Sequence, residues 1–440
     1  MGVGAAINAF FSTIVEIFLY CIALNQSKGK LVEGSVIGSI LGGVLLLPGT
    51  SMCGGAINRK TQRYNPASAG VSSTMLLYSM LAMMSPTILY EIYGQYEVEC
   101  TACSPEIGGS DCRKCHFFQP SIVVDKLYLN YLRPFTVICA ISLFLAYCIG
   151  LLFTLKTHAA MIWTTPVSAE KEKREYAIEV QSIKSGEQSS QHHHASRRPS
   201  LKPQHSSHHV AHSMASHVQP SVSLQQQPEP AAGGHDAPNW SRTKSTTILL
   251  SATLLYATIA EVLVDVVDDV LSAYPIHPKF LGLTIFALVP STTEFVNAIS
   301  FAMHGNVALS MEIGSAYALQ VCLLQIPVVV LYSCYKNAGL TSVNSIVDGF
   351  GKFVTSLIVH GDEVSTTNID NMFTLIFPRW DFFAVIISVY MFTYIYAEGK
   401  SNYFKGSILI LLYACILIGY YFAIEIDSTG LGMVKSFVMN

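Results

Sequence analysis

The sequence predicts an all-α polytopic membrane protein, and its composition, its long apolar runs and its charge placement support that fold class. About half of the 440 residues are apolar (51%) and only 12% are charged, whereas soluble domains have about 25% charged residues. Runs of 18 or more mostly apolar residues recur along the chain, and about 20 such residues cross the hydrocarbon layer as a helix. The formal charge of −3, with charges in loops, argues against nucleic-acid binding.

Apolar periodicity predicts about nine transmembrane helices. The first lacks the basic segment and cleavage site of a signal peptide, so we expect it to be retained. The predicted spans are residues 4–24, 31–50, 70–93, 132–155, 247–271, 279–303, 306–335, 373–397 and 403–425.

Positive charge predicts how these spans are oriented. Arg59, Lys60 and Arg63 follow the second span, and residues 156–246 carry ten Lys and Arg, so both segments are expected in the cytosol. Alternation then places residues 94–130 on the opposite, lumenal side. That segment contains a C-x2-C…C-x2-C array. The array can form two disulfides or a zinc site, or can hold unpaired thiols; its residues are Cys100, Cys103, Cys112 and Cys115.

Residues 156–246 predict a disordered cytosolic linker, because their Ser, Gln, Pro and His enrichment provides too little apolar surface to fold. Nine histidines lie between His192 and His235. They form either a weak metal-binding or pH-sensing loop, or an unconstrained sequence without function. The linker divides the chain into a first repeat, 1–155, and a second repeat, 247–430.

The two apolar blocks resemble each other, with two glutamates each and a Gly-Ser pair in a small-residue helix. Glu16 lies 22 residues before Gly38-Ser39, and Glu294 lies 20 before Gly314-Ser315. The orientation count makes the repeats inverted, as in many secondary transporters. The two blocks together place four carboxylates within the membrane, and the insertion of each costs about 2.5–3.5 kcal/mol on insertion scales. They are Glu16, Glu33, Glu294 and Glu312.

The residues around these glutamates suit a hard cation, because hydroxyl and carboxylate oxygens bind such ions. Ser12 and Thr13 precede Glu16, while Ser291, Thr292 and Thr293 precede Glu294. Pro290 is expected to break the helix at this site. Burial favours protonation of a carboxylate, so the same residues can hold a cation or protons. The sequence contains no H-E-x-x-H motif, the ligand pair that an intramembrane metalloprotease would need. A cation channel or sensor is a more distant alternative to a transporter.

These blocks resemble the alpha repeats of the calcium/cation antiporter superfamily, in its cation/proton exchanger branch. The resemblance rests on "STIVE", "GSILGG", "PSTTE" and "ALQVCLLQIP". It implies the cation exchanger fold and a cation/proton site at Glu16 and Glu294, lined by Ser39 and Gln320. The sequence "IAEVLVDVVDDVL" is similar to the family's acidic gating helix, which implies gating roles for Glu261, Asp265 and Asp268.

Departures from the family pattern favour monovalent ions. Thr13 and Ser291 replace the repeat asparagines, and Gly43 replaces the asparagine after "GSIL". These changes resemble the fungal vacuolar low-affinity monovalent cation/proton antiporters. They imply Na+ or K+ exchange for protons at a vacuolar membrane, with Ca2+/H+ exchange as the alternative. The family's first helix has no counterpart here, so we expect an incomplete amino terminus. Lipid and small cations are the expected partners, without a cofactor, and oligomeric state stays open.

Overall fold

The computed structural model describes residues 2–94, 97–102, 113–118, 127–157, 242–274, 276–337, 373–428 and 436–439. All of them belong to one compact unit. Of the expected linker, 156–246, most residues lie outside this described part, although helix α8 already begins at Arg242.

The first half consists of helices that contain π-helical turns. The long second span is continuous from Gly29 to Asn58 and has a π turn at its centre, where the helix widens to i→i+5 hydrogen bonding. The elements are α1 (Gly2–Asn25), α2 (Gly29–Leu41), η1 (Gly42–Leu46), α3 (Leu47–Asn58), α4 (Pro66–Tyr93), η3 (Tyr128–Leu132), α5 (Arg133–Leu152) and η4 (Phe153–Thr157).

The second half repeats this construction, and another long span carries a central π turn. The expected helix 279–303 is interrupted at residues 289–291, where Pro290 lies. The elements are α8 (Arg242–Ala273), α9 (Pro278–Leu281), η5 (Gly282–Phe286), α10 (Thr292–Met303), α11 (Val307–Gln320), η6 (Val321–Gln325), α12 (Ile326–Asn337), α14 (Arg379–Ala397) and α15 (Tyr403–Ser428).

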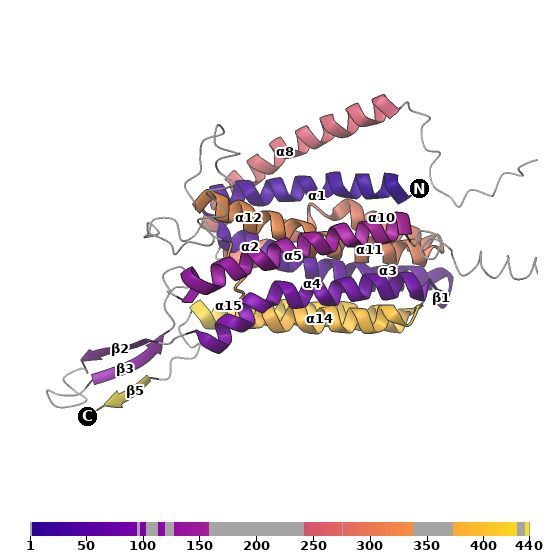
Figure 1. Cartoon of the computed structure of the whole chain (residues 1–440). Coiled ribbons are helices and arrows are strands. Elements are labelled where there is room, and N and C mark those ends of the chain that lie inside the picture. The colour runs from indigo at the N-terminus through magenta and orange to yellow at the C-terminus, as the bar shows by residue number, and fades with distance from the viewer. Residues whose placement is uncertain are drawn as a thin grey trace, which may run out of the picture. The chain divides into compact units, whose positions relative to one another are not determined.

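The structure confirms the all-α membrane class but not the count of nine spans. Seven helices of the described residues are long and apolar enough to cross a membrane, and Thr13–Asn25 is a shorter apolar helix. The interruption at 289–291 divides another of the predicted spans into two short helices. In Figure 1, α1, α4, α5 and α14 run in roughly the same direction; α4 lies beside α5 and α14, and α8 is tilted beside α1.

The two halves interleave, because glycines let their helices meet backbone to backbone. A Cβ at Gly34 would lie 2.1 Å from the Lys279 carbonyl oxygen, and one at Gly282 would lie 2.3 Å from that of Leu31. Helix α2 therefore packs directly on α9 and η5. Helix α3 contacts α10 and α15, and α4 contacts α14. The core crosses between the halves and includes Ile37, Leu41, Leu283 and Val321.

Two small sheets connect distant segments at the helix ends. Strand β1 (Thr61–Arg63) pairs antiparallel with β4 (Lys400–Asn402). Strand β3 (Arg113–Phe118) pairs with β2 (Glu97–Ala102) and with β5 (Ser436–Met439). The predicted alternation of the spans places all strands of each sheet on the same membrane face. The observed strand pairing agrees with that prediction. Which face is cytosolic stays a prediction.

Candidate functional site

Glu16 is a buried carboxylate in the middle of the helical unit. Its residue is 2% exposed, and its Oε2 accepts a hydrogen bond from the Gln325 Nε2. Its Oε1 is buried and has no hydrogen-bond partner among the described residues. A buried carboxylate that is only half satisfied is costly as an anion, so it favours a proton or a metal cation beside it.

A second glutamine of the same span also faces α1. The Thr13 hydroxyl donates a hydrogen bond of 3.0 Å to the Gln320 Oε1. Gln320 directly precedes the π turn η6 and Gln325 is its last residue, and i→i+5 hydrogen bonding brings residues five apart to adjacent turns. The π turn therefore lets both amides reach α1, which an uninterrupted α-helix would not do.

A cluster of hydroxyl groups lies one turn along α1 from Glu16. Tyr20 lies one turn along α1, and its phenol oxygen accepts a hydrogen bond of 3.3 Å from Ser35 and lies 3.4 Å from the Ser39 hydroxyl. Tyr20 and Tyr317 are both close enough to Glu16 to interact with it electrostatically. Of the predicted site, the structure thus joins Thr13 to Gln320 and places Ser39 beside Tyr20, one turn from Glu16. Ser12 lies next to Thr13 on α1, but its side chain is outside the described part.

Glu294 begins the helix that follows the break at Pro290. It lies in the first turn of α10 and is half-buried; its Oε2 accepts a 2.8 Å hydrogen bond from the Thr293 hydroxyl. Ser291 is fully buried and donates to the Ala287 carbonyl at 2.9 Å, while Thr292 donates to the Val289 carbonyl at 2.8 Å. Glu294 and Glu16 interact electrostatically, but their assembly into one ion site stays a prediction.

Glu33, which was expected in the cation site, instead belongs to a separate ion cluster. Lys279 Nζ lies 2.7 Å from its Oε1 and 2.6 Å from the Asp381 Oδ2. Glu33 also lies 3.9 Å from Lys30 Nζ. A local ammonium group thus already balances its charge. The other outer glutamate, Glu312, is half-buried and accepts a 3.2 Å hydrogen bond from the Ser68 hydroxyl of α4.

The acidic helix α8 contacts the turn between α1 and α2. Gln26 donates a hydrogen bond to Asp265, and Lys28 Nζ lies 3.3 Å from the Asp268 Oδ2. Glu261, Asp265 and Asp268 are all exposed in this unit. A role of these acids in gating or ion access stays a prediction.

The sequence analysis missed Gln325, Lys279 and Asp381. Gln325 was visible as the residue before Ile326-Pro327 in an otherwise apolar run, but only the π turn shows that it reaches Glu16. Lys279 and Asp381 each lie in the first turn of a helix, where a charged residue is normally read as interfacial. Because about a hundred residues separate Lys279 and Asp381 in the sequence, no local sequence pattern could indicate that they form a pair.

The cysteine segment is only partly described. Cys100 and Cys115 are opposite each other in the antiparallel register of β2 and β3. Cys103 and Cys112 lie outside the described residues. Among the described residues, no group of three or more potential metal ligands occurs.

Known proteins resemble this chain along nearly its whole length. The low affinity vacuolar monovalent cation/H+ antiporter of Saccharomyces cerevisiae is 53% identical over 424 residues, which are 96% of this chain and 38% of the relative. A putative cation exchanger of Schizosaccharomyces pombe is 47% identical over 443 residues, which are 96% of this chain and 47% of that protein. The chain thus spans less than half the length of these two curated relatives.

Two further matches concern the fold and the second half of the chain. The crystal structure of the selenium-substituted Ca2+/H+ antiporter protein YfkE aligns with a TM-score of 0.53 at 18% identity, over 95% of this chain and 85% of that one. Residues 244–422 match the family model described as sodium/calcium exchanger protein. Residues 244–422 of the chain are thus similar to the sodium/calcium exchanger protein family, and its described part shares the fold of YfkE.

Proposed function

We propose that the protein is a secondary active antiporter that exchanges Na+ or K+ for protons across a vacuolar membrane. The observation that carries this proposal is the half-satisfied Glu16 carboxylate, buried between α1 and η6. The similarity to a vacuolar monovalent cation/H+ antiporter at 53% identity supports the choice of reaction and membrane.

In this proposal, Glu16 and Glu294 bind the cation and the protons alternately. When Glu16 is ionised, a cation beside its Oε1 balances the charge; when the cation leaves, a proton takes its place. The Gln325 amide holds the carboxylate in position through both steps. Because either ligand neutralises the same oxygen, binding of one displaces the other, and the two fluxes are coupled.

The ligand chemistry favours a monovalent ion. Calcium takes six to eight oxygens and several formal charges. Here Thr13 and Ser291 provide hydroxyls, and both donate their hydrogens to groups of the protein, namely the Gln320 amide and the Ala287 carbonyl. Na+ and K+ tolerate such weak, uncharged ligands better because their dehydration cost is much lower than that of a divalent ion.

A Ca2+/H+ antiporter is the second candidate, and one observation favours it. The Gln325 Oε1 is buried without a hydrogen-bond partner among the described residues, and amide oxygens are good calcium ligands. Together with two carboxylates, such an oxygen would strengthen the site for a divalent ion.

A flux experiment separates the two candidates. The chain is reconstituted into vesicles with an acidic interior, and proton efflux is recorded after addition of Na+, K+ or Ca2+ outside. We expect millimolar Na+ or K+ to release protons and micromolar Ca2+ to release none. Efflux with micromolar Ca2+ alone would replace the monovalent assignment by the calcium one, and efflux with no cation would reject both.

A further inference from the structure

A pocket separate from the Glu16 site lies near the ends of four helices. It has a volume of about 300 Å³ and is lined from α2, α9, α14 and α15. Lys30 lies at the start of α2, His277 caps α9, Pro378 caps α14, and Tyr420 lies near the end of α15. Helix ends of membrane spans lie at the level of the lipid headgroups, so the pocket faces that layer.

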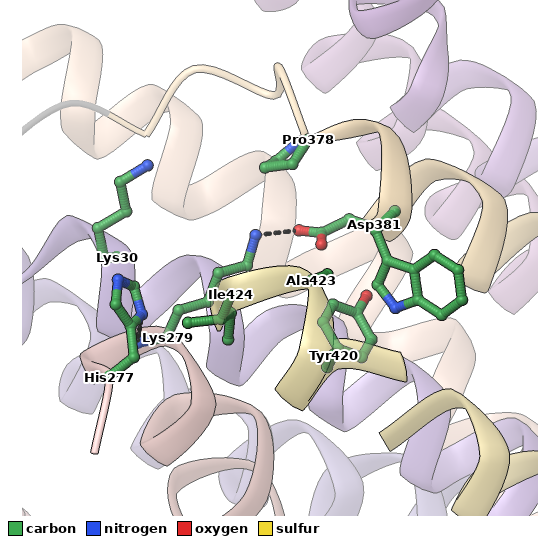
Figure 2. Close-up of a pocket in the computed structure, with 9 residues that line it drawn as sticks. Lys30, His277, Lys279, Pro378, Asp381, Tyr420, Ala423 and Ile424 are labelled. Atoms are coloured by element: carbon green, nitrogen blue, oxygen red, sulfur yellow. Dashed lines mark hydrogen bonds and ion pairs between the residues drawn. The ribbon is translucent and has the colours of Figure 1, made fainter. Parts of the chain in front are cut away.

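The ion cluster at the floor of the pocket carries a surplus negative charge when Glu33 is counted, which contacts Lys279 but does not itself line the pocket. The Lys279 ammonium lies between Glu33 and Asp381, so one positive charge faces two carboxylates. Lys279 is 6% exposed and Asp381 is 1% exposed. Figure 2 shows the Lys279–Asp381 pair at the centre of the pocket, with Tyr420 on one side of it. A ligand with a positive group therefore gains most at the floor.

The rim of the pocket carries the opposite sign. The Lys30 side chain is 65% exposed and lies 3.9 Å from Glu33, and Figure 2 shows it with His277 on the side away from Tyr420. Counting Lys30 and Lys279 against Glu33 and Asp381, the four charges cancel. A ligand that carries both signs, positive inside and negative at the rim, would match this distribution without leaving a net charge.

An aromatic and apolar wall completes the pocket. Trp380 and Tyr420 pack edge to face with ring centroids 6.2 Å apart, next to Ala423 and Ile424. Aromatic rings attract ammonium and quaternary ammonium groups. The Tyr420 hydroxyl is buried and makes no hydrogen bond among the described residues, although it lies near enough to Asp381 to interact with it electrostatically.

We propose that this pocket binds the zwitterionic headgroup of a phospholipid, with the ammonium group at the floor and the phosphate at the rim. In such a lipid the ammonium is the distal end of the headgroup and the phosphate is nearer the acyl chains, which is the order that the pocket requires. The ammonium lies against Asp381 and the Trp380–Tyr420 wall, and Lys30 binds the phosphate. This site is independent of the proposed transport reaction.

The tryptophans provide a direct reporter. The chain has three, and Trp163 and Trp240 lie outside the described residues. A Trp163→Phe/Trp240→Phe background leaves Trp380 alone, on the pocket wall. Phosphatidylcholine titrated into detergent micelles should change its emission saturably, whereas phosphatidylglycerol with the same acyl chains lacks the ammonium and should bind about tenfold more weakly.

Variants and soluble probes decide whether the pocket is responsible. Lys30→Gln and Tyr420→Leu should each weaken phosphatidylcholine binding about tenfold, while the exposed control Lys400→Gln should match the parent. Equal responses to both lipids, or equal affinity in all three variants, would overturn the proposal. The same response to chain-free phosphocholine at equal concentration would reassign the site to a soluble headgroup, and a response to NaCl alone would reassign it to an ion.

Discussion

The Gln325 side-chain amide donates a hydrogen bond to the Glu16 carboxylate, across 309 residues of sequence and between the two halves of the chain. Both residues are buried, at 0% and 2% exposure. This contact links the π turn η6 to helix α1. It fixes one carboxylate oxygen and leaves the other available to a ligand.

Replacement of Gln325 by Ala should weaken cation binding by roughly 10- to 100-fold, because a hydrogen bond to a charged group contributes about 1.5–3 kcal/mol. The measurement is the cation concentration that gives half-maximal proton efflux from vesicles. Gln62→Ala is the matched control, since Gln62 is also a buried glutamine but donates to the Gly55 carbonyl, at 2.8 Å. Equal half-maximal concentrations in both variants would remove Gln325 from the site.

Gly43 stands where the resembling family has asparagine, and the packing explains why. A Cβ at this position would lie 3.0 Å from Tyr317 and 3.2 Å from Ala318, at the crossing of η1 and α11. Gly43→Asn should therefore destabilise the protein by about 1–3 kcal/mol. Gly70→Asn is the control, since nothing lies within 4 Å of a Cβ there. If Gly43→Asn and Gly70→Asn change the melting temperature by the same amount relative to the parent, this explanation of Gly43 is contradicted.

Lys279 lies between two carboxylates from different halves, the buried Asp381 and the partly buried Glu33. Lys279→Met should destabilise the protein by about 3–5 kcal/mol, because it leaves Glu33 and Asp381 without their shared cation. A second change, Asp381→Asn, should restore much of the loss by removing one of the two charges. The readout is the melting temperature in detergent. Lys405→Met is the control, because its partner Glu398 is half exposed. If Lys279→Met melts like the control, the cluster does not stabilise the fold.

The β2–β3 register favours disulfides over zinc for the cysteine segment. Cys100 and Cys115 are directly opposite each other, and opposite residues in antiparallel strands have Cα separations that a disulfide can bridge. In a Cys103→Ser/Cys112→Ser variant, we expect a maleimide reagent to label Cys100 and Cys115 only after reduction. If both cysteines are labelled without reduction, the disulfide is excluded. If they are labelled only after a chelator is added, a zinc site is supported instead.

The fold class was predictable because long apolar runs and sparse charge are read locally. The break at Pro290 was predictable for the same reason, and the helix is interrupted there. The π turns at Gly42–Leu46 and Val321–Gln325 were not, because nothing in their residues distinguishes them from an α-helix. They are set by how the spans cross each other.

The site was only partly predictable. The repeat placed Glu16, Thr13 and Gln320 in one group, and the structure joins Thr13 to Gln320 and buries Glu16 nearby. The inclusion of Glu33 among the cation-binding residues stays a prediction, and the sequence did not reveal that Glu33 pairs with Lys279 from the other half. Such a partner depends on the packing of α2 against α9 through Gly34 and Gly282, which a single sequence does not reveal.

Proton efflux driven by Na+ or K+, compared between the parent, Glu16→Gln and Glu91→Gln, tests the role of Glu16 most directly. Glu91 is the matched control, since it pairs with Arg379 at a helix end, at 2.9 Å. We predict parental efflux in Glu91→Gln and no cation-driven efflux in Glu16→Gln, with equal amounts of folded protein in the vesicles. Efflux at the parental rate in Glu16→Gln would contradict exchange at the Glu16 carboxylate.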